Sequence, residues 1–298
     1  MKPVTWLTTG ANESAAPETL WQDIARCGWL PTQPGRVVIH APGMDDDPRV
    51  RDTVRSLATF LHRLAPPPRI EIVDGTAASG TADPFADWPG VERLDLRRHP
   101  RYLVDVACLR DGAWIPEAWL DDLFVITVAG VAPDGRLGIR GVLAAQAALL
   151  DAPHALDLDV AFEAHRLLRP SLGVACGAIT HGDARSGSWW AISPDDIALE
   201  RAVASQAGLH PDALPVLRHF ARHELLEPPG TLGDPGAPRI HGYTVPAWRV
   251  GLARLGETTA DRSRRMVKDL ELSAHNIRRL PQFLQRRMPS LARFGRTG

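Results

Sequence analysis

Lysine is almost absent from this chain. The 34 Lys and Arg residues include only two lysines, Lys2 and Lys268. A Schiff-base lysine, a pyridoxal phosphate site and a Walker-type phosphate loop each need a lysine in the fold interior, and neither of these two is placed for that. We therefore expect no pyridoxal phosphate and no phosphate loop of that type.

Cysteine is also scarce. Cys27, Cys108 and Cys176 lie far apart, and no C-x-x-C motif occurs. This spacing does not support zinc knuckles or an iron–sulfur cluster, so we expect no cofactor. An odd number of separated cysteines is typical of a reduced cytoplasm, which is the location we expect.

Long apolar segments are missing as well. The first twenty residues contain Asn12, Glu13, Pro17 and Glu18 instead of an apolar core, so we expect no signal peptide. The longest apolar stretch, 123–132, is too short to span a bilayer. We expect no membrane partner.

Charge is distributed unevenly along the chain. From Arg262 to the end there are nine Arg and one Lys against Asp269 and Glu271, which gives +8, and the overall charge of −1 leaves about −9 for the rest. We expect a basic helical tail over 251–298, with a helix over 257–279. We favour a solvated helix that docks its apolar side on the acidic body over nucleic-acid binding, because the tail lacks interleaved aromatic residues. The tail is also a candidate for contact with a protein partner or in a homo-oligomer.

Strand and helix patterns alternate through the body of the chain, as in an α/β fold with a mainly parallel sheet flanked by helices. At 298 residues the chain is long enough for two lobes, which we place at 1–118 and 119–250. The expected strands are 36–40, 69–74, 123–128, 172–177 and 189–192, and the expected helices are 48–64, 141–150, 157–168 and 195–208.

The block from Ile192 to His210 is the most informative segment. An apolar run stops at Ser193-Pro-Asp195, and a helix begins with Pro194 and acidic side chains and ends at Gly208. This block resembles the signature of the DUF362 family of uncharacterised bacterial and archaeal α/β proteins. Asp195 and Glu200 match its two acids and Ala198 its alanine.

A second set of matches lies near the amino terminus, where Asp47-Pro-Arg-Val50 and Asp74 fit the family pattern and His40 replaces its usual lysine. The chain also departs from the family. It lacks the cysteine-rich cluster segment, it has no Lys-x-His pair in 128–133, and Cys176 stands where relatives often have Asp. The electron-transfer role of cluster-bearing relatives is therefore not expected here.

Ligands of α/β sheets gather at the carboxyl ends of the strands, which selects the candidate site residues. The expected catalytic residues are His40, His181, Asp183 and Asp195, and the expected substrate-binding residues are Asp74, Arg140, Arg185 and Asp196.

Two of these candidate segments have structural alternatives. The glycine-rich loop 181–187 either approaches an anionic ligand or forms a hairpin turn. Asp195 either serves the site or only caps a helix, and one role does not exclude the other.

His219 and His223 share one helix face at i and i+4, which is half of a metal site. No partner motif accompanies them, so we expect no metal and keep the pair as a weak alternative.

Three functions remain open at this point. The favoured one is a cofactor-independent bacterial enzyme of the isomerase, racemase or lyase type, which binds a small polar or anionic metabolite and uses histidine as a base. This function expects His181 and Asp195 to share one pocket. The alternatives are a degenerate DUF362-like binding or structural subunit of a complex, and a metal-dependent enzyme.

Overall fold

A computed structural model describes residues 4–11, 16–30, 35–74, 85, 88, 90–94, 101–104, 113–116, 124–134, 137–149, 158–168, 171–181, 184–206, 209, 211, 214–223 and 230–233. The chain divides into two compact units, Met1–Val250 and Gly251–Gly298, and all described residues belong to the first. The helix expected at 257–279 and the rest of the basic tail lie outside the described residues.

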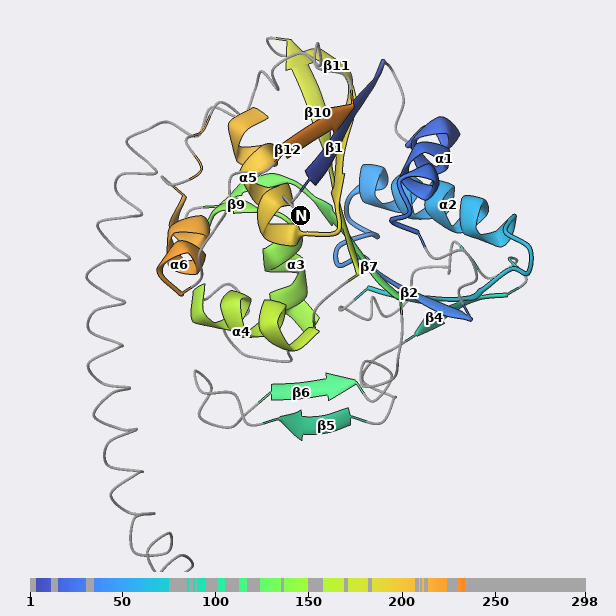
Figure 1. Ribbon diagram of the computed structural model, residues 1–298, viewed down its shortest axis with the longest axis horizontal. Coiled ribbons are helices and arrows are strands. Elements are labelled where there is room, and N and C mark those ends of the chain that lie inside the picture. Colours follow the sequence, from blue (N-terminus) through green and yellow to red (C-terminus); the bar gives the residue numbers. More distant parts are fainter. Residues whose placement is uncertain are drawn as a thin grey trace, which may run out of the picture. The chain divides into compact units, whose positions relative to one another are not determined.

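An eight-stranded sheet forms the centre of the first unit (Figure 1). Its order is β12-β1-β11-β10-β7-β2-β3-β4. The strands are β1 (Val4–Ala11), β2 (Arg36–His40), β3 (Arg69–Val73), β4 (Val91–Leu94), β7 (Phe124–Gly130), β10 (Leu172–His181), β11 (Ala184–Ser193) and β12 (Gly230–Gly233).

Most neighbouring strands in this sheet are parallel. Parallel pairing runs from β10 through β7, β2 and β3 to β4, and it also joins β1 to β12. Strand β11 is antiparallel to both β10 and β1. The predicted α/β fold with a mainly parallel sheet is confirmed.

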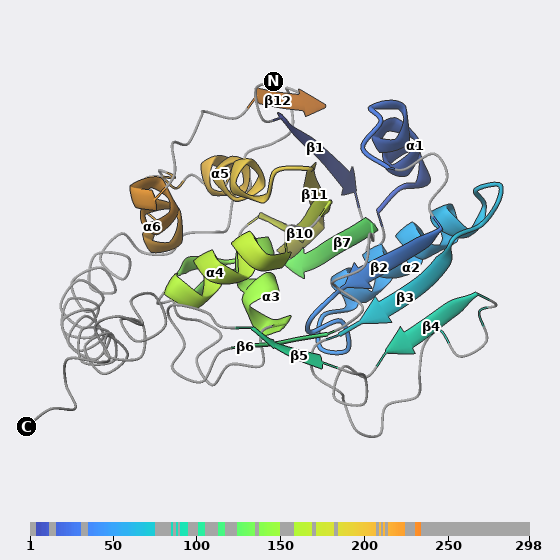
Figure 2. The same ribbon diagram turned by 60° about the horizontal axis from the view of Figure 1, so that its bottom comes forward.

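Helices cover both faces of the sheet (Figure 2). Helices α1 (Glu18–Arg26) and α2 (Pro48–His62) pack on one face through Trp21, Val54 and Leu57. Helices α3 (Val142–Leu149), α4 (Leu158–Leu168), α5 (Asp196–Gln206) and α6 (Pro215–His223) belong to the cores of the other face. None of the described helices is long and apolar enough to cross a membrane.

The residues around position 47 explain why α2, the helix between β2 and β3, begins at Pro48. Asp47 precedes α2 in an extended conformation, and its side chain accepts a hydrogen bond from the backbone N–H of Arg49 at 3.0 Å. Pro48 occupies the first turn, where a missing N–H costs no hydrogen bond. The helix then buries its apolar side against β7 and β10.

The expected boundary near residue 118 does not separate two sheets. Strand β2, from the expected first lobe, pairs directly with β7 from the second, with Val37 opposite Phe124. Strands from both ranges therefore belong to the same eight-stranded sheet. The other expected boundary, after residue 250, coincides with the division between the two compact units.

Several elements were not predicted from the sequence. They are β1, α1, β4, β12 and two small antiparallel pairs, β5 (Arg101–Val104) with β6 (Ala113–Pro116) and β8 (Ala132–Asp134) with β9 (Gly138–Arg140). Most of these strands have only three or four residues, too few for a periodic pattern to stand out.

Candidate functional site

The direction of β11 separates two of the predicted catalytic residues. Strands β10 and β11 form an antiparallel pair in which His181 lies opposite Ala184 and Gly173 lies opposite Ser193. His181 and Gly173 are eight residues apart, about 26 Å along an extended strand. Asp195 follows Ser193, so it lies at the opposite end of this strand pair from His181. The shared pocket expected for His181 and Asp195 is therefore wrong.

Strands β10 and β11 pair as far as His181 and Ala184, on either side of residues 182 and 183. His181 ends β10 and Arg185 lies in β11, with a register shift between Ile179 and Thr180. Asp183 lies outside the described residues. This antiparallel pairing of the flanking strands is what the hairpin alternative for this loop predicted.

A charged group does form at the carboxyl edge of β2 and β3. Asp74 directly follows β3, Asp45 lies in the loop after β2, and both carboxylates contact Nη2 of Arg93 on β4. The Arg93–Asp45 distance is 2.6 Å, and the side chains of Arg93, Asp45 and Asp74 are 17%, 17% and 4% exposed. Partial burial would lower the pKa of Arg93, but the hydrogen bonds to the two acids raise it, so the guanidinium stays charged.

A second ion pair lies at the start of α2. Arg49 holds Asp47 through two side-chain hydrogen bonds of 3.0 and 2.8 Å. Partial burial would raise the pKa of Asp47, but the bonds from Arg49 and from the backbone of Val50 outweigh it and lower that pKa. The Asp47 carboxylate therefore stays ionised and is occupied in capping α2.

Cys176 and His40 are sealed inside the protein beside this edge. Burial raises the pKa of the Cys176 thiol to about 12, and it lowers the pKa of His40 to about 3. At neutral pH the thiol is protonated and the imidazole is uncharged. In this conformation neither side chain reaches solvent. His40 therefore does not contact a substrate directly, although its predicted role as a base requires that contact.

A buried polar cluster joins α3, α4 and α5. Asp196 accepts a 2.6 Å hydrogen bond from Nε2 of Gln146, and His165 Nδ1 lies 3.3 Å from Gln146 Oε1 and 3.6 Å from Asp196 Oδ2. Burial raises the pKa of Asp196, although His165 and Gln146 oppose that effect. Asp196 was predicted to bind substrate, but the structure buries it between these helices and Gly173 of β10.

Glu200 completes this cluster one turn further along α5. Its carboxylate accepts a 3.1 Å hydrogen bond from the backbone N–H of Leu143 at the start of α3. Burial raises the pKa of Glu200 to about 7, and the neighbouring Asp196 adds to that effect. The i, i+4 spacing of Asp196 and Glu200 in an apolar helix was the signal in the sequence, whereas nothing singled out Gln146 or His165.

Asp195 has the geometry of a helix cap. Its Oδ1 accepts a 2.8 Å hydrogen bond from the backbone N–H of Ala198, and its own N–H donates to Ser193 Oγ at 3.0 Å. A carboxylate at this position stabilises a helix start by about 1 kcal/mol. The capping role offered as one alternative for Asp195 is therefore present.

The remaining predicted residues lie elsewhere. Arg140, at the end of β9, is half exposed and lies 3.3 Å from Asp134. Nε2 of His219 lies 3.2 Å from Asp159, and its ring packs edge-on against Phe162. Within the described ranges no three His, Cys, Asp or Glu side chains are grouped to hold a metal ion.

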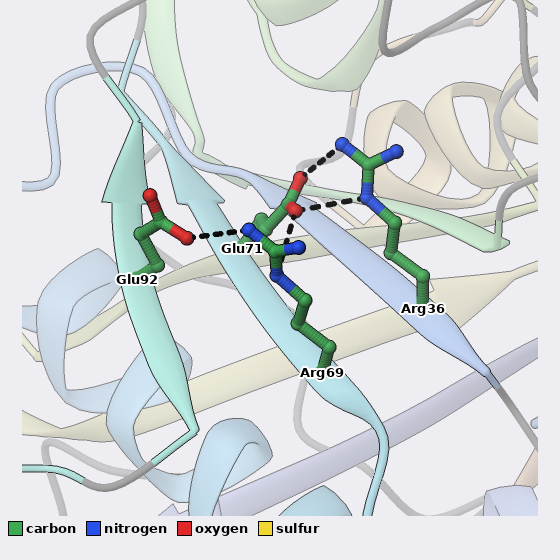
Figure 3. Close-up of polar contacts among 4 residues, drawn as sticks. All are labelled: Arg36, Arg69, Glu71 and Glu92. Atoms are coloured by element: carbon green, nitrogen blue, oxygen red, sulfur yellow. Dashed lines mark hydrogen bonds and ion pairs between the residues drawn. The ribbon is translucent and has the colours of Figure 1, made fainter.

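A network of ion pairs crosses β2, β3 and β4 at the amino-terminal end of these strands (Figure 3). Glu71, only 1% exposed, binds Nε and Nη2 of Arg36 at 2.8 and 2.6 Å and contacts Arg69 at 3.2 Å. Arg69 also reaches Glu92 at 2.7 Å. These four described side chains link the amino-terminal ends of the three strands.

Comparison with known proteins adds little to this geometry. No family model matches the chain, and no curated protein matches it. Among solved structures the chain is similar to a Thermotoga maritima protein, with 9% sequence identity and a TM-score of 0.36 over 61% of this chain. The matched part covers 55% of that protein, so the chain spans about half its length. The fold itself defines the class, an α/β protein with a mostly parallel sheet.

Proposed function

We propose that this chain is a bacterial, cytoplasmic enzyme that binds a small polar metabolite at the carboxyl edge of β2, β3 and β4. It moves a proton on that molecule without a cofactor, as an isomerase, racemase or lyase does. The observation that carries the proposal is the position of Arg93. Its Nη2 is held by Asp45 and Asp74, and within the described part of the chain its Nε and Nη1 make no hydrogen bond.

The charges at this edge narrow the chemistry of the ligand. Among the described residues of this edge, the carboxylates of Asp45 and Asp74 flank the guanidinium of Arg93, and Asp47 pairs with Arg49. This arrangement supports a zwitterion, such as an amino acid, whose carboxylate binds Arg93 while its ammonium faces the two aspartates.

The choice of a base follows from exposure. His40 is shielded, and an arginine does not lose its proton near neutral pH. Asp45 is more exposed than Asp74, 17% against 4%. We assign proton abstraction to Asp45 and the positioning of Arg93 to Asp74.

Membership of the DUF362 family belongs to the same proposal. It is supported by the capped helix starts at Asp47 and Asp195, the two positions where the sequence matches the family signature.

The test is binding and isotope exchange with single amino acids as probes. Thermal unfolding is measured with each amino acid, and NMR in D₂O follows exchange of the α-proton. We expect at least one probe to raise the Tm and to exchange its α-proton, and Arg93→Met to abolish both effects. Arg69→Met is the matched control, because Arg69 also pairs with acids but lies at the other end of β3. Equal responses of the two variants would contradict the proposal.

A second function, a binding or structural subunit, is favoured by a different observation. His40 and Cys176 are buried and uncharged, and Asp195 is engaged in capping. A subunit of this kind would give no isotope exchange with any probe and would copurify with a protein partner or with another copy of itself. Exchange that depends on Arg93 would exclude this alternative.

A further inference from the structure

A row of buried polar side chains crosses the sheet beneath α3 and α5. The strand register places His40 of β2 opposite Thr127 of β7, Thr127 opposite Gly173 of β10, and Gly173 opposite Ser193 of β11. Thr5 of β1 extends the row, because the next residue, Trp6, lies opposite Ile192. We call Thr5, Ser193, Gly173, Thr127 and His40 the polar row.

The polar row faces the helices of one side only. The residues that alternate with it, among them Ile39, Ile126, Leu172 and Ile192, point into the core formed with α1 and α2. Successive side chains of a strand point to opposite faces, so the polar row points toward the other face. There α3 contacts β7 and β10, and α5 contacts β10, β11 and β1.

Asp196 joins the polar row from the helix side. A β-carbon added at Gly173 would collide with Asp196 Oδ1, so this oxygen lies against the sheet between Thr127 and Ser193. Its other oxygen is held by Gln146. Asp196 is 2% exposed, and burial raises its pKa.

Three oxygen atoms along this line have no hydrogen-bond partner among the described residues: Thr5 Oγ1, Thr127 Oγ1 and Asp196 Oδ1. Thr5 and Thr127 are 0% and 1% exposed. A buried polar group without a partner costs about 1–3 kcal/mol, and ordered water is the usual means of satisfying several such groups at once.

The distance between Thr5 and Thr127 shows whether one bound ion or several water molecules could contact both hydroxyls. Thr5 and Thr127 lie three strands apart, which is about 14 Å at 4.7–4.9 Å per strand. One cation coordinated at 2–3 Å does not reach both hydroxyls. A file of hydrogen-bonded water molecules does, and hydroxyl and carboxylate oxygens are suitable partners for it.

We propose that ordered water molecules occupy the interface between the polar row and helices α3 and α5, anchored on Asp196 Oδ1 and on the hydroxyls of Thr5 and Thr127. The file extends toward His40 at the end of β2, beside the loop that carries Asp45. It hydrogen-bonds α5 to the middle of the sheet at the point where Gly173 provides no side chain. The hydration site does not depend on the proposed function.

Replacement of a threonine by the similarly shaped valine tests this inference. If water binds the hydroxyls, Thr127→Val and Thr5→Val each lose a hydrogen bond, and we expect the Tm to fall by about 2–4 °C. If the hydroxyls are simply unsatisfied, the same changes remove a buried cost and raise the Tm. Thr53→Val is the control for a hydroxyl whose partner is known, because Thr53 Oγ1 accepts a 3.0 Å hydrogen bond from Trp190 Nε1.

Water contacts are then observed directly by NMR. With Thr methyl groups labelled, we expect nuclear Overhauser effects from long-lived water to Thr5 and Thr127, and their loss at Thr127 in Asp196→Leu. Unfolding in NaCl, KCl, NH₄Cl and choline chloride at equal ionic strength tests the cation alternative. A Tm rise specific to one cation, or valine variants with raised Tm and no water contacts, would overturn the proposal.

Discussion

The carboxylate of Glu200 on α5 accepts a hydrogen bond from the backbone N–H of Leu143, so a side chain 57 residues away caps the first turn of α3. A carboxylate at a helix amino terminus is stabilised by the free N–H groups there and by the helix dipole. This contact opposes the cost of burying the charge, and burial still raises the pKa of Glu200 to about 7. The contact between α3 and α5 therefore involves a carboxyl group that loses its proton near neutral pH.

The stability of the protein is expected to fall as the pH rises through this range. The folded state binds a proton on Glu200 more tightly than the unfolded chain, whose pKa is 4.5. The stabilisation is complete below pH 4.5 and is lost as the pH rises to about 7, with an upper limit of roughly 3 kcal/mol. Glu200→Gln should flatten this part of the profile in urea unfolding measured from pH 4 to 8. Asp46→Asn, at an exposed acid, serves as the control, and an unchanged slope in Glu200→Gln would contradict the assignment.

Gly173→Ala should destabilise the protein by about 2–3 kcal/mol, because the added methyl group collides with Asp196 Oδ1 and Leu199. Gly35→Ala is the matched control, since a β-carbon there meets nothing within 4 Å. Chemical unfolding of the two variants measures the difference. Similar free energies of unfolding would mean that α5 moves away from β10 at little cost.

Arg36→Met should cost about 3 kcal/mol, because it removes two hydrogen bonds from the buried Glu71 carboxylate and leaves it with the more exposed Arg69. Arg69→Met should cost less than about 1 kcal/mol, since Arg69 and Glu92 are 61% and 52% exposed. Urea unfolding at pH 7 compares the two changes. A larger effect of Arg69→Met would show that Glu71 depends on the exposed arginine.

Thiol reactivity should differ sharply between two of the cysteines. Cys27 is exposed, whereas Cys176 is buried with its pKa raised to about 12, and only thiolates react with disulfide reagents. In a Cys108→Ser background, native protein should react rapidly at Cys27 and at Cys176 only after unfolding. Mass spectrometry of the labelled peptides identifies the modified residue, and fast labelling of Cys176 would show that the interior beside β10 opens readily.

The sequence predicted the elements whose burial is nearly complete. Strand β2 was predicted at its observed bounds because Val37, Val38 and Ile39 form an uninterrupted apolar run between turn residues. Helix α2 was predicted from its regularly spaced aliphatic residues and from Asp47-Pro48. Strand β1 was missed, because Val4–Ala11 mixes threonines with apolar residues and gains its pairing from β11 and β12, far along the chain.

The site was harder to predict because it depends on strand direction. Placing Asp195 beside His181 required β11 to run parallel to β10, but only residues 182 and 183 separate these strands, and so short a connection permits only antiparallel pairing. The expected strands, 172–177 and 189–192, left a longer connection between them, so this constraint was not visible in the sequence. The group of Asp45, Asp74 and Arg93 was only half visible, because Arg93 belongs to a four-residue strand without a clear pattern.

The place of β1 in the sheet has a consequence for biosynthesis. This first strand of the chain lies between β11 and β12, which are made about 180 and 225 residues later. While the chain is being translated, β2, β3 and β7 can associate as soon as they leave the ribosome, but β1 has no neighbour until β11 and β12 emerge. Strand β1 therefore stays unpaired until β11 has been made, and this side of the sheet is complete only after residue 233 has been added.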